Sequence, residues 1–100
     1  MKRLWSCLTD DMEHCIYTGS PYVERHHVFY NMGGKMKQRC EKYGFIAPLS
    51  PDLHPNGTQA GVNARKVDKD LKQRCQRYYE EHYGTRKQFM QEFGKNFLED

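Results

Sequence analysis

Two adjacent histidines, His26 and His27, are the residues of this sequence with the clearest chemical potential. They lie in segment 22–30, which is rich in the β-branched and aromatic residues typical of an extended strand. Neighbouring side chains on a strand point to opposite sides, so one imidazole can bind a metal ion while the other faces a substrate. A neutral imidazole, with an unperturbed pKa of about 6.5, is also a suitable general base at cellular pH.

The elements that must position these histidines follow from turn residues and hydrophobic spacing. Before the first strand, Thr18-Gly19-Ser20-Pro21 reads as a turn. The pattern then predicts an extended segment at 22–30 and a break at Gly33-Gly34. A short polar helix is expected over 35–43, ended by Gly44. A second extended segment follows at 45–49, with Pro48 at an edge or irregularity, and then a loop over 51–61. His54 falls in that loop, and Asn63 falls in the first turn of a helix that follows it.

The second half of the chain is predicted to be helical. Apolar residues at spacings of three to four indicate a long helix that starts near Gly61 or Val62 and ends at Gly84. Its inward stripe is expected to comprise Val67, Leu71, Cys75, Tyr78 or Tyr79, and His82. The capping-box pattern Thr85-Arg86-Lys87-Gln88 opens a last helix bearing Phe89, Met90, Phe93 and Phe97.

Composition limits the protein to one modest domain, residues 1–100. With 37% hydrophobic residues and 13% aromatic residues, the chain has enough apolar side chains to fold. No apolar run approaches the roughly 20 residues of a membrane span, so we expect no membrane partner and a cytoplasmic location. The four cysteines contain no CxxC pair, which favours reduced, structural thiols.

The net charge of +3 is a mild excess, so an interaction with DNA depends on how the basic residues cluster. One cluster comprises Lys35, Lys37, Arg39 and Lys42. A second follows the long helix and comprises Arg65, Lys66, Lys69, Lys72, Arg74 and Arg77. Each cluster is compatible both with phosphate binding and with an ordinary solvated helix face.

Several motifs together resemble a group of small phage and prophage HNH proteins, also called His-Me finger or ββα-metal nucleases. The motifs are Glu24-Arg25-His26-His27-Val28-Phe29-Tyr30, Glu41-Lys42-Tyr43-Gly44-Phe45-Ile46, Pro48-Leu49-Ser50-Pro51-Asp52-Leu53-His54, Gly61-Val62-Asn63 and Phe93-Gly94-Lys95-Asn96-Phe97-Leu98. The resemblance implies an α+β fold, in which two strands and the long helix form a ββα-metal core around one divalent cation and a short helix follows.

The resemblance also implies roles for individual residues. His26 and His54 are the expected metal ligands, and His27 is the expected general base that takes a proton from water. The hydroxide then attacks phosphorus, and the cation stabilises the leaving oxygen. Phosphate oxygens are expected to be bound by Arg25 or by a basic side chain of the cluster Lys35, Lys37, Arg39 and Lys42. The alternative for His54 is an exposed loop histidine beside Pro55.

Asn63 stands where the resembled proteins place a further histidine, in a Gly-Val-His pattern. An Asn carbonyl binds hard cations but is a weak ligand for zinc or nickel, so the expected cofactor is Mg²⁺ or Mn²⁺, with Ni²⁺ or Zn²⁺ as alternatives. Helix capping is an equally open explanation for Asn63.

Two further departures bear on the site. Phe45 occupies the place of the asparagine that usually braces the general base, and Asn31 or Asn56 is a potential spatial substitute. The resembled proteins carry cysteines where this chain has Cys15, Thr18 and Ser50, so a second, structural zinc is not expected.

Two functions of different class follow. The first is a metal-dependent DNA endonuclease that hydrolyses phosphodiester bonds. The alternative is a catalytically degenerate HNH scaffold of phage origin that binds DNA or inhibits a host defence protein. A third interpretation is a small metal-stabilised interaction module without nucleic-acid contact. Nicking of plasmid DNA with Mg²⁺, Mn²⁺ or Ni²⁺, stopped by EDTA, distinguishes the enzyme from the others.

Overall fold

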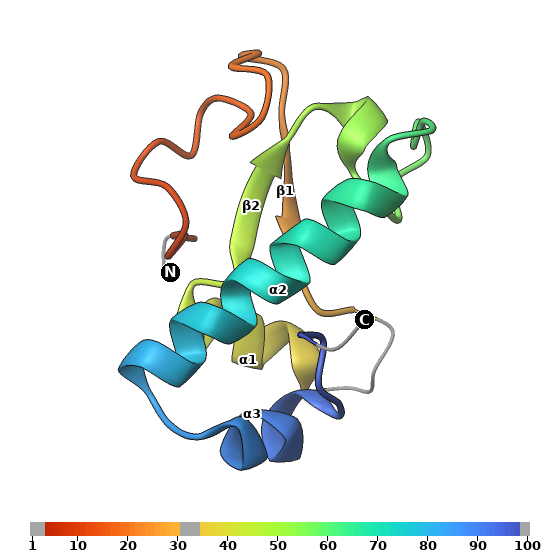
Figure 1. Ribbon diagram of the computed structural model, residues 1–100. Coiled ribbons are helices and arrows are strands. Elements are labelled where there is room, and N and C mark those ends of the chain that lie inside the picture. The colour runs from red at the N-terminus through yellow and green to blue at the C-terminus, as the bar shows by residue number, and fades with distance from the viewer. Residues whose placement is uncertain (1–3, 31–34, 99–100) are drawn as a thin grey trace.

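Within residues 4–30 and 35–98, which the computed structural model describes, two strands and three α-helices form an α+β fold (Figure 1). The elements in chain order are β1 (Glu24–His27), α1 (Met36–Tyr43), β2 (Ile46–Leu49), the 3-10 helix η1 (Pro51–Leu53), α2 (Ala64–His82) and α3 (Arg86–Phe93). The expected α+β class, with a long helix followed by a short final one, is confirmed. The expected break at Gly33-Gly34 lies outside the described residues.

The two strands pair antiparallel, with His26 opposite Ala47. Strand β1 is shorter than the predicted segment 22–30, because Val28 and Phe29 are both fully buried and consecutive inward side chains do not fit an alternating strand. Pro48 lies opposite Arg25. Each strand of a two-stranded sheet has a free edge, which accommodates the missing N–H of proline as expected.

Helix α1 ends as predicted at Gly44, which adopts a left-handed conformation with φ +72°. Its N–H donates to the Cys40 carbonyl oxygen. A second constraint also favours glycine here, because a Cβ at this position would lie 2.5 Å from the Trp5 ring. The turn between α1 and β2 therefore needs both the backbone freedom and the small size of glycine.

Helix α2 begins at Ala64, two to three residues later than predicted. The Gly61 N–H donates to the Asp52 carbonyl oxygen at 2.8 Å, which holds Gly61 in the preceding loop, and Val62 is 94% exposed. The inward stripe is largely confirmed, and its buried members are Val67, Leu71, Cys75 and Tyr79. The expectation for His82 is wrong, because this residue is exposed in the last turn.

Helix α3 opens with the predicted capping box. The Thr85 hydroxyl accepts from the Gln88 N–H at 3.1 Å, and the Gln88 side-chain oxygen accepts from the Thr85 N–H at 2.7 Å. Phe89 and Phe93 are buried as expected, whereas Met90 is 41% exposed because it lies on the solvent side of this short helix. The helix packs against α2.

An aromatic cluster joins the strands to the last helix. Phe29, which follows β1, has its ring centroid 5.7 Å from that of Phe45 and 4.6 Å from that of Phe93. Each of these rings is fully buried, and burying a phenylalanine contributes about 1.5 to 3 kcal/mol. The cluster therefore fixes the end of β1 and the start of β2 relative to α3.

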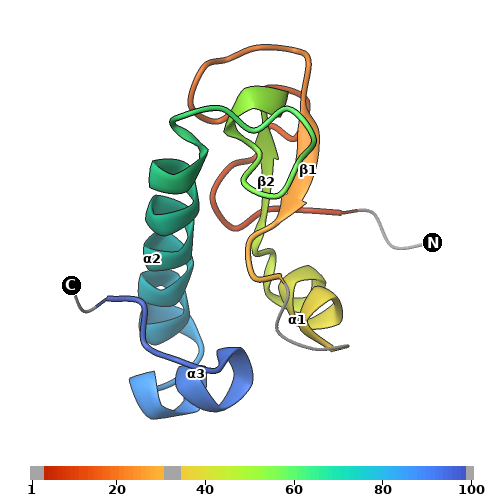
Figure 2. The same cartoon turned by 90° about the vertical axis from the view of Figure 1, so that its right-hand side faces the viewer.

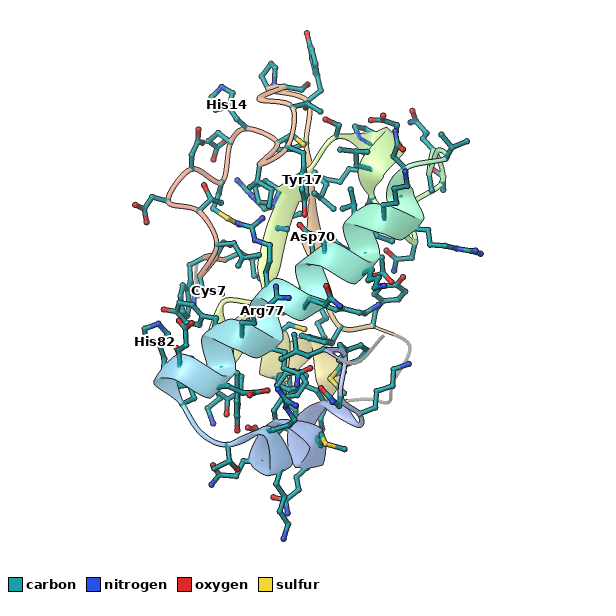
Figure 3. The ribbon with its side chains drawn as sticks, viewed as in Figure 1. Cys7, His14, Tyr17, Asp70, Arg77 and His82 are labelled. Atoms are coloured by element: carbon teal, nitrogen blue, oxygen red, sulfur yellow. The ribbon has the colours of Figure 1, made fainter. Side chains whose placement is uncertain are left out.

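Helix α2 crosses the sheet, and the N-terminal segment runs along its β2 side (Figures 1 and 2), where the Ile16 N–H donates to the Pro48 carbonyl oxygen at 3.2 Å. Figure 3 shows Tyr17 of this segment beside Asp70 of α2, and the Tyr17 hydroxyl donates to the Asp70 carboxylate. Of the helices in the described part of the chain, none is long and apolar enough to cross a membrane.

Candidate functional site

His26 and His54 lie side by side, with ring centroids 4.8 Å apart at an interplanar angle of 66°. We call them the paired-histidine site. His26 projects from β1 into the interior and is only 1% exposed, and His54 follows η1. The Nε2 atom of His26 is buried and has no hydrogen-bond partner among residues 4–30 and 35–98. Buried polar atoms are almost always satisfied, so this nitrogen marks a place where a ligand is expected.

Glu24 orients the second histidine. Its Oε1 atom lies 2.6 Å from His54 Nδ1, and the His54 side chain is 18% exposed, so His54 is a half-buried residue with a carboxylate partner rather than a free loop histidine. A carboxylate on Nδ1 fixes the tautomer that leaves Nε2 free as a ligand atom. Glu24 was not predicted as a site residue, although it lies two positions before His26 and therefore on the same side of the strand.

Gly57 makes this contact sterically feasible. A Cβ at Gly57 would lie 2.9 Å from His54 Nδ1 and 3.1 Å from Glu24 Oε1. Both distances are shorter than ordinary van der Waals contact, so any side chain at this position must displace the Glu24–His54 pair. The backbone of the loop after η1 is therefore packed directly against the Glu24–His54 pair.

His26 is held in its neutral form. Burial, and after it the neighbouring charges of His54, Lys72 and His27, lower the pKa of its imidazole to about 3. Neutral imidazole is the form that coordinates metal ions. The electrostatics of the site therefore favour a ligand role for His26 over a role in proton transfer.

The Tyr30 ring contacts His26, and a charged pair from α2 lies behind that ring. The Tyr30 ring lies edge-on to His26, with centroids 5.3 Å apart, and the Lys72 ammonium lies over the Tyr30 ring at 4.5 Å. Lys72 in turn contacts both Asp68 carboxylate oxygens, at 2.6 and 2.8 Å. Burial, aided by Asp68, raises the pKa of Tyr30 to about 12. The i,i+4 spacing of Asp68 and Lys72 on the buried face of α2 was a sequence signal for this pair.

His27 points away from the buried pair, which confirms that the adjacent histidines face opposite sides. Its Nε2 atom lies 3.0 Å from Glu41 Oε2 on α1, and its side chain is 20% exposed. If Nε2 carries the proton shared with Glu41, Nδ1 is the basic nitrogen. The partnership with Glu41 depends on the packing of α1 against β1 and has no local sequence signal.

Asn63 occupies the N-cap position of α2, but its exposed side chain makes no capping hydrogen bond within the described structure. The capping explanation for this residue is therefore not supported. Among residues 4–30 and 35–98, no three His, Cys, Asp or Glu side chains converge to hold a metal ion. The protein donors brought together are thus the two imidazoles of His26 and His54.

Phe45 is fully buried, so its side chain cannot brace His27 as an asparagine would. Its carbonyl oxygen instead accepts from the Val28 N–H at 3.0 Å. This main-chain bond anchors the residue that follows His27. Asn56 is exposed, and Asn31 lies outside the described residues.

The residues expected to contact phosphate fall into two groups. Lys35, Lys37 and Lys42 are exposed. Arg25 is paired with Glu13 at 2.9 Å, and Arg39 donates to the Glu92 carbonyl oxygen at 2.6 Å. The two arginines therefore have protein partners, which leaves the lysines as the accessible cations of this set.

Three positions where the resembled proteins carry cysteines also come together. The Thr18 and Ser50 hydroxyl oxygens lie 2.8 Å apart. Burial opposes ionisation of the Cys15 thiol, but hydrogen bonds from Ser50 and Thr18 outweigh it and lower its pKa to about 7. One thiol and two hydroxyls are poor donors for zinc compared with thiolates.

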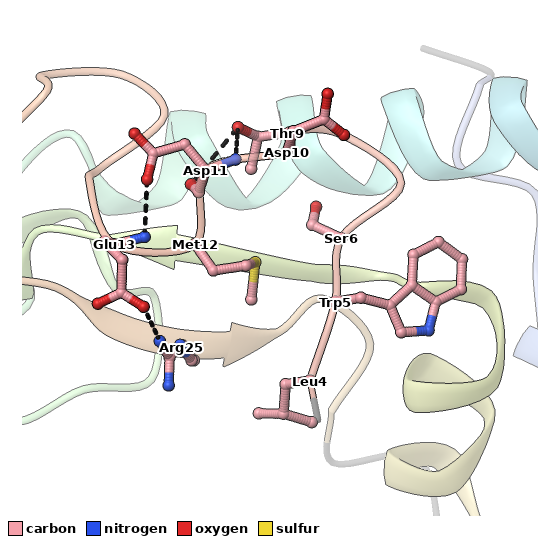
Figure 4. A pocket seen from close by; sticks show the side chains of 9 residues that line it. All are labelled: Leu4, Trp5, Ser6, Thr9, Asp10, Asp11, Met12, Glu13 and Arg25. Carbon is pink, nitrogen blue, oxygen red and sulfur yellow. Dashed lines mark hydrogen bonds and ion pairs between the residues drawn. The ribbon is translucent and has the colours of Figure 1, made fainter. Parts of the chain in front are cut away.

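A cavity of about 610 Å³ lies elsewhere, beneath the N-terminal segment (Figure 4). Its lining includes Trp5, Met12 and the carboxylates of Asp10, Asp11 and Glu13, and it does not include His26 or His54. The lining also includes Arg25, but this cation is paired with Glu13, and the carboxylates outnumber it and repel phosphate, so the cavity as it stands does not favour a nucleic-acid backbone.

No family model matches this chain, and neither the curated proteins nor the solved structures compared with it include a match. The basis for a functional assignment is therefore the chemistry of the paired-histidine site and of His27. Both are built from the first strand and from the elements that pack on either side of it.

Proposed function

We propose that this protein is a metal-dependent DNA endonuclease of the HNH, or His-Me finger, type, with β1, β2 and α2 as its ββα-metal core. The observation that carries the proposal is the buried, unpartnered Nε2 of His26 beside His54. A divalent cation is the ligand that satisfies a neutral imidazole nitrogen and the free nitrogen of a carboxylate-oriented histidine together.

The donors present fit such an ion. Two imidazoles with Glu24 behind one of them form the ligand pair and its supporting carboxylate found at many metal sites. The proposed cofactor is one divalent cation, Mg²⁺ or Mn²⁺, with Ni²⁺ or Zn²⁺ as the alternatives that imidazole itself favours. When bound, the cation supplies stabilisation of the negative charge on the leaving oxygen.

His27 is the proposed general base. Glu41 holds the ring through Nε2, so the opposite nitrogen can accept a proton from water. The resulting hydroxide attacks phosphorus, the bond from phosphorus to the leaving oxygen breaks, and the proton stays on His27. The proximity of His27 to His26 in the chain places base and ligand on one strand, which fixes their relative position.

The proposed DNA contacts are the exposed Lys35, Lys37 and Lys42. Lys37 and Lys42 lie on α1, the helix that also carries Glu41, so phosphates bound there would pass close to His27. Arg25 and Arg39 remain proposed contacts, but each must exchange a protein partner for phosphate.

A second function is favoured by one specific observation: among the described residues, the imidazole donors at the site are two, and no third His, Cys, Asp or Glu side chain joins them to hold a metal ion. A metal held weakly by two ligands would support the fold of a phage HNH scaffold without turnover. Such a protein would bind DNA or inhibit a host defence protein.

The test is cleavage of supercoiled plasmid with Mg²⁺, Mn²⁺ or Ni²⁺, alongside metal titration by calorimetry. We expect nicking that EDTA abolishes. His26→Ala and His54→Ala should lose metal binding. His27→Ala should lose cleavage but still bind the metal. His82→Ala is the matched control, because this histidine is exposed at the far end of α2.

Metal binding that persists in His26→Ala and in His54→Ala would refute the site. Metal binding without cleavage in the wild type would favour the second function. Cleavage that survives His27→Ala would refute the role given to the base.

A further inference from the structure

A charged pair on α2, Asp68 and Lys72, is packed beside the paired-histidine site. Lys72 is only 9% exposed, and lysines are almost never this buried without a partner. Its ammonium contacts both carboxylate oxygens of Asp68, at 2.6 and 2.8 Å. The Asp68 side chain is 24% exposed, so little solvent screens the pair.

The pair reaches His26 through one aromatic ring. The Lys72 ammonium lies 4.5 Å from the centre of the Tyr30 ring, whose centre lies 5.3 Å from that of His26. The ammonium is therefore no farther from the centre of the His26 ring than the sum of these two distances.

A purely mechanical role does not account for these charges. Apolar side chains of similar size would join α2 to the segment after β1 without the cost of desolvating an ion pair. Charge, unlike packing, acts on an ion at the neighbouring site, because Coulomb interactions are stronger where water is excluded. The pair contributes one negative and one positive charge to a site that already has the carboxylate of Glu24.

We propose that Asp68 and Lys72 together set the divalent-metal affinity of the paired-histidine site. Asp68 raises the affinity through its negative charge, and Lys72 lowers it by neutralising that charge. This inference rests on the proposed metal-binding function. It gives α2 residues an electrostatic role that does not require them to coordinate the ion.

The test compares Lys72→Met, Asp68→Asn and the double variant in the full chain by calorimetric titration with Mn²⁺. Lys72→Met leaves an unpaired carboxylate, so Mn²⁺ should bind at least about tenfold more tightly. Asp68→Asn leaves an unpaired ammonium, and the affinity should fall by at least about tenfold. The double variant has the net charge of the wild type and should return to within about threefold of its affinity.

Arg74→Met is the matched control, because Arg74 pairs with Asp70 on the same helix at 3.8 Å and is more exposed than Lys72. It should leave Mn²⁺ affinity unchanged. If Lys72→Met does not fold, Asp68→Asn and the double variant still decide the question, because the double variant contains no unpaired buried charge.

A mechanical role predicts that every variant of the pair weakens Mn²⁺ binding, and that result would overturn the inference. Equal affinities in all variants would overturn it as well. If Mn²⁺ binding to the wild type is instead absent or insensitive to His26→Ala, the proposed function itself fails. The two failures are therefore distinguishable.

Discussion

Removal of the Glu24 carboxylate tests whether the site is organised for a metal. Glu24 Oε1 lies 2.6 Å from His54 Nδ1, and the carboxylate supports the ligand without being one. Loss of such a supporting group typically weakens metal binding by about 10- to 100-fold, or about 1.4 to 2.7 kcal/mol. The Glu24 side chain is 41% exposed, so solvent screening puts the purely electrostatic part near the lower limit.

Two substitutions separate charge from orientation. Glu24→Gln keeps an oxygen that can accept from Nδ1–H, so we expect about a tenfold loss of Mn²⁺ affinity. Glu24→Ala also frees the His54 ring to rotate, and the loss should approach about 100-fold. Calorimetric titration with Mn²⁺ measures both, and circular dichroism melts establish that the variants remain folded.

Glu13→Gln is the matched control. Its carboxylate pairs with Arg25, which lies next to Glu24 in β1, but it is 70% exposed and lines the cavity described above, whose lining does not include the histidines. It should bind Mn²⁺ like the wild type. Unchanged Mn²⁺ affinity in Glu24→Ala would refute the view that His54 is an oriented ligand.

The remaining predictions concern four other features. Gly57→Ala should weaken Mn²⁺ binding at least several-fold in calorimetry, because its Cβ would lie 2.9 Å from His54 Nδ1; wild-type affinity would contradict this. Asn63→His should raise Ni²⁺ or Zn²⁺ affinity and, since no capping bond is lost, change stability by less than about 0.5 kcal/mol; unchanged affinity would exclude position 63 as a ligand. In the presence of EDTA, the free energy of unfolding measured with urea should fall as the pH drops from about 6.5 towards about 3, by up to about 1.4 kcal/mol per pH unit. The reason is that His26 takes up a proton in the unfolded chain but not in the folded chain. His26→Gln should reduce this pH dependence. DNA affinity should fall steeply with salt, and the Lys37→Glu and Lys42→Glu changes should weaken binding to all sequences alike; salt-independent binding would contradict a phosphate contact.

Local sequence signals predicted the parts of this fold that depend on local interactions. The capping box at Thr85 and the left-handed Gly44 involve neighbours within four residues, and both form as expected. The opposite orientation of His26 and His27 follows from strand geometry alone. These features could be predicted because no distant contact competes with them.

Features that depend on distant contacts could not be predicted. The start of α2 was missed because Gly61 is bonded to Asp52 across a loop. The contacts of His27 with Glu41 and of His54 with Glu24 join residues 14 and 30 positions apart. Periodicity identifies which face of an element is buried, but it does not identify the partner on another element.

The aromatic cluster around Phe29 restricts the movement of the strand that carries the histidines. Phe29 lies three residues after His26, and its ring centroid is 4.6 Å from that of Phe93 in the last helix. A ligand pair that is already ordered pays no conformational entropy when the ion arrives, so its affinity is higher than that of the same residues on a mobile loop. Small losses of packing at Phe93 should therefore increase the mobility of His26 and weaken metal binding under conditions where the chain is still folded.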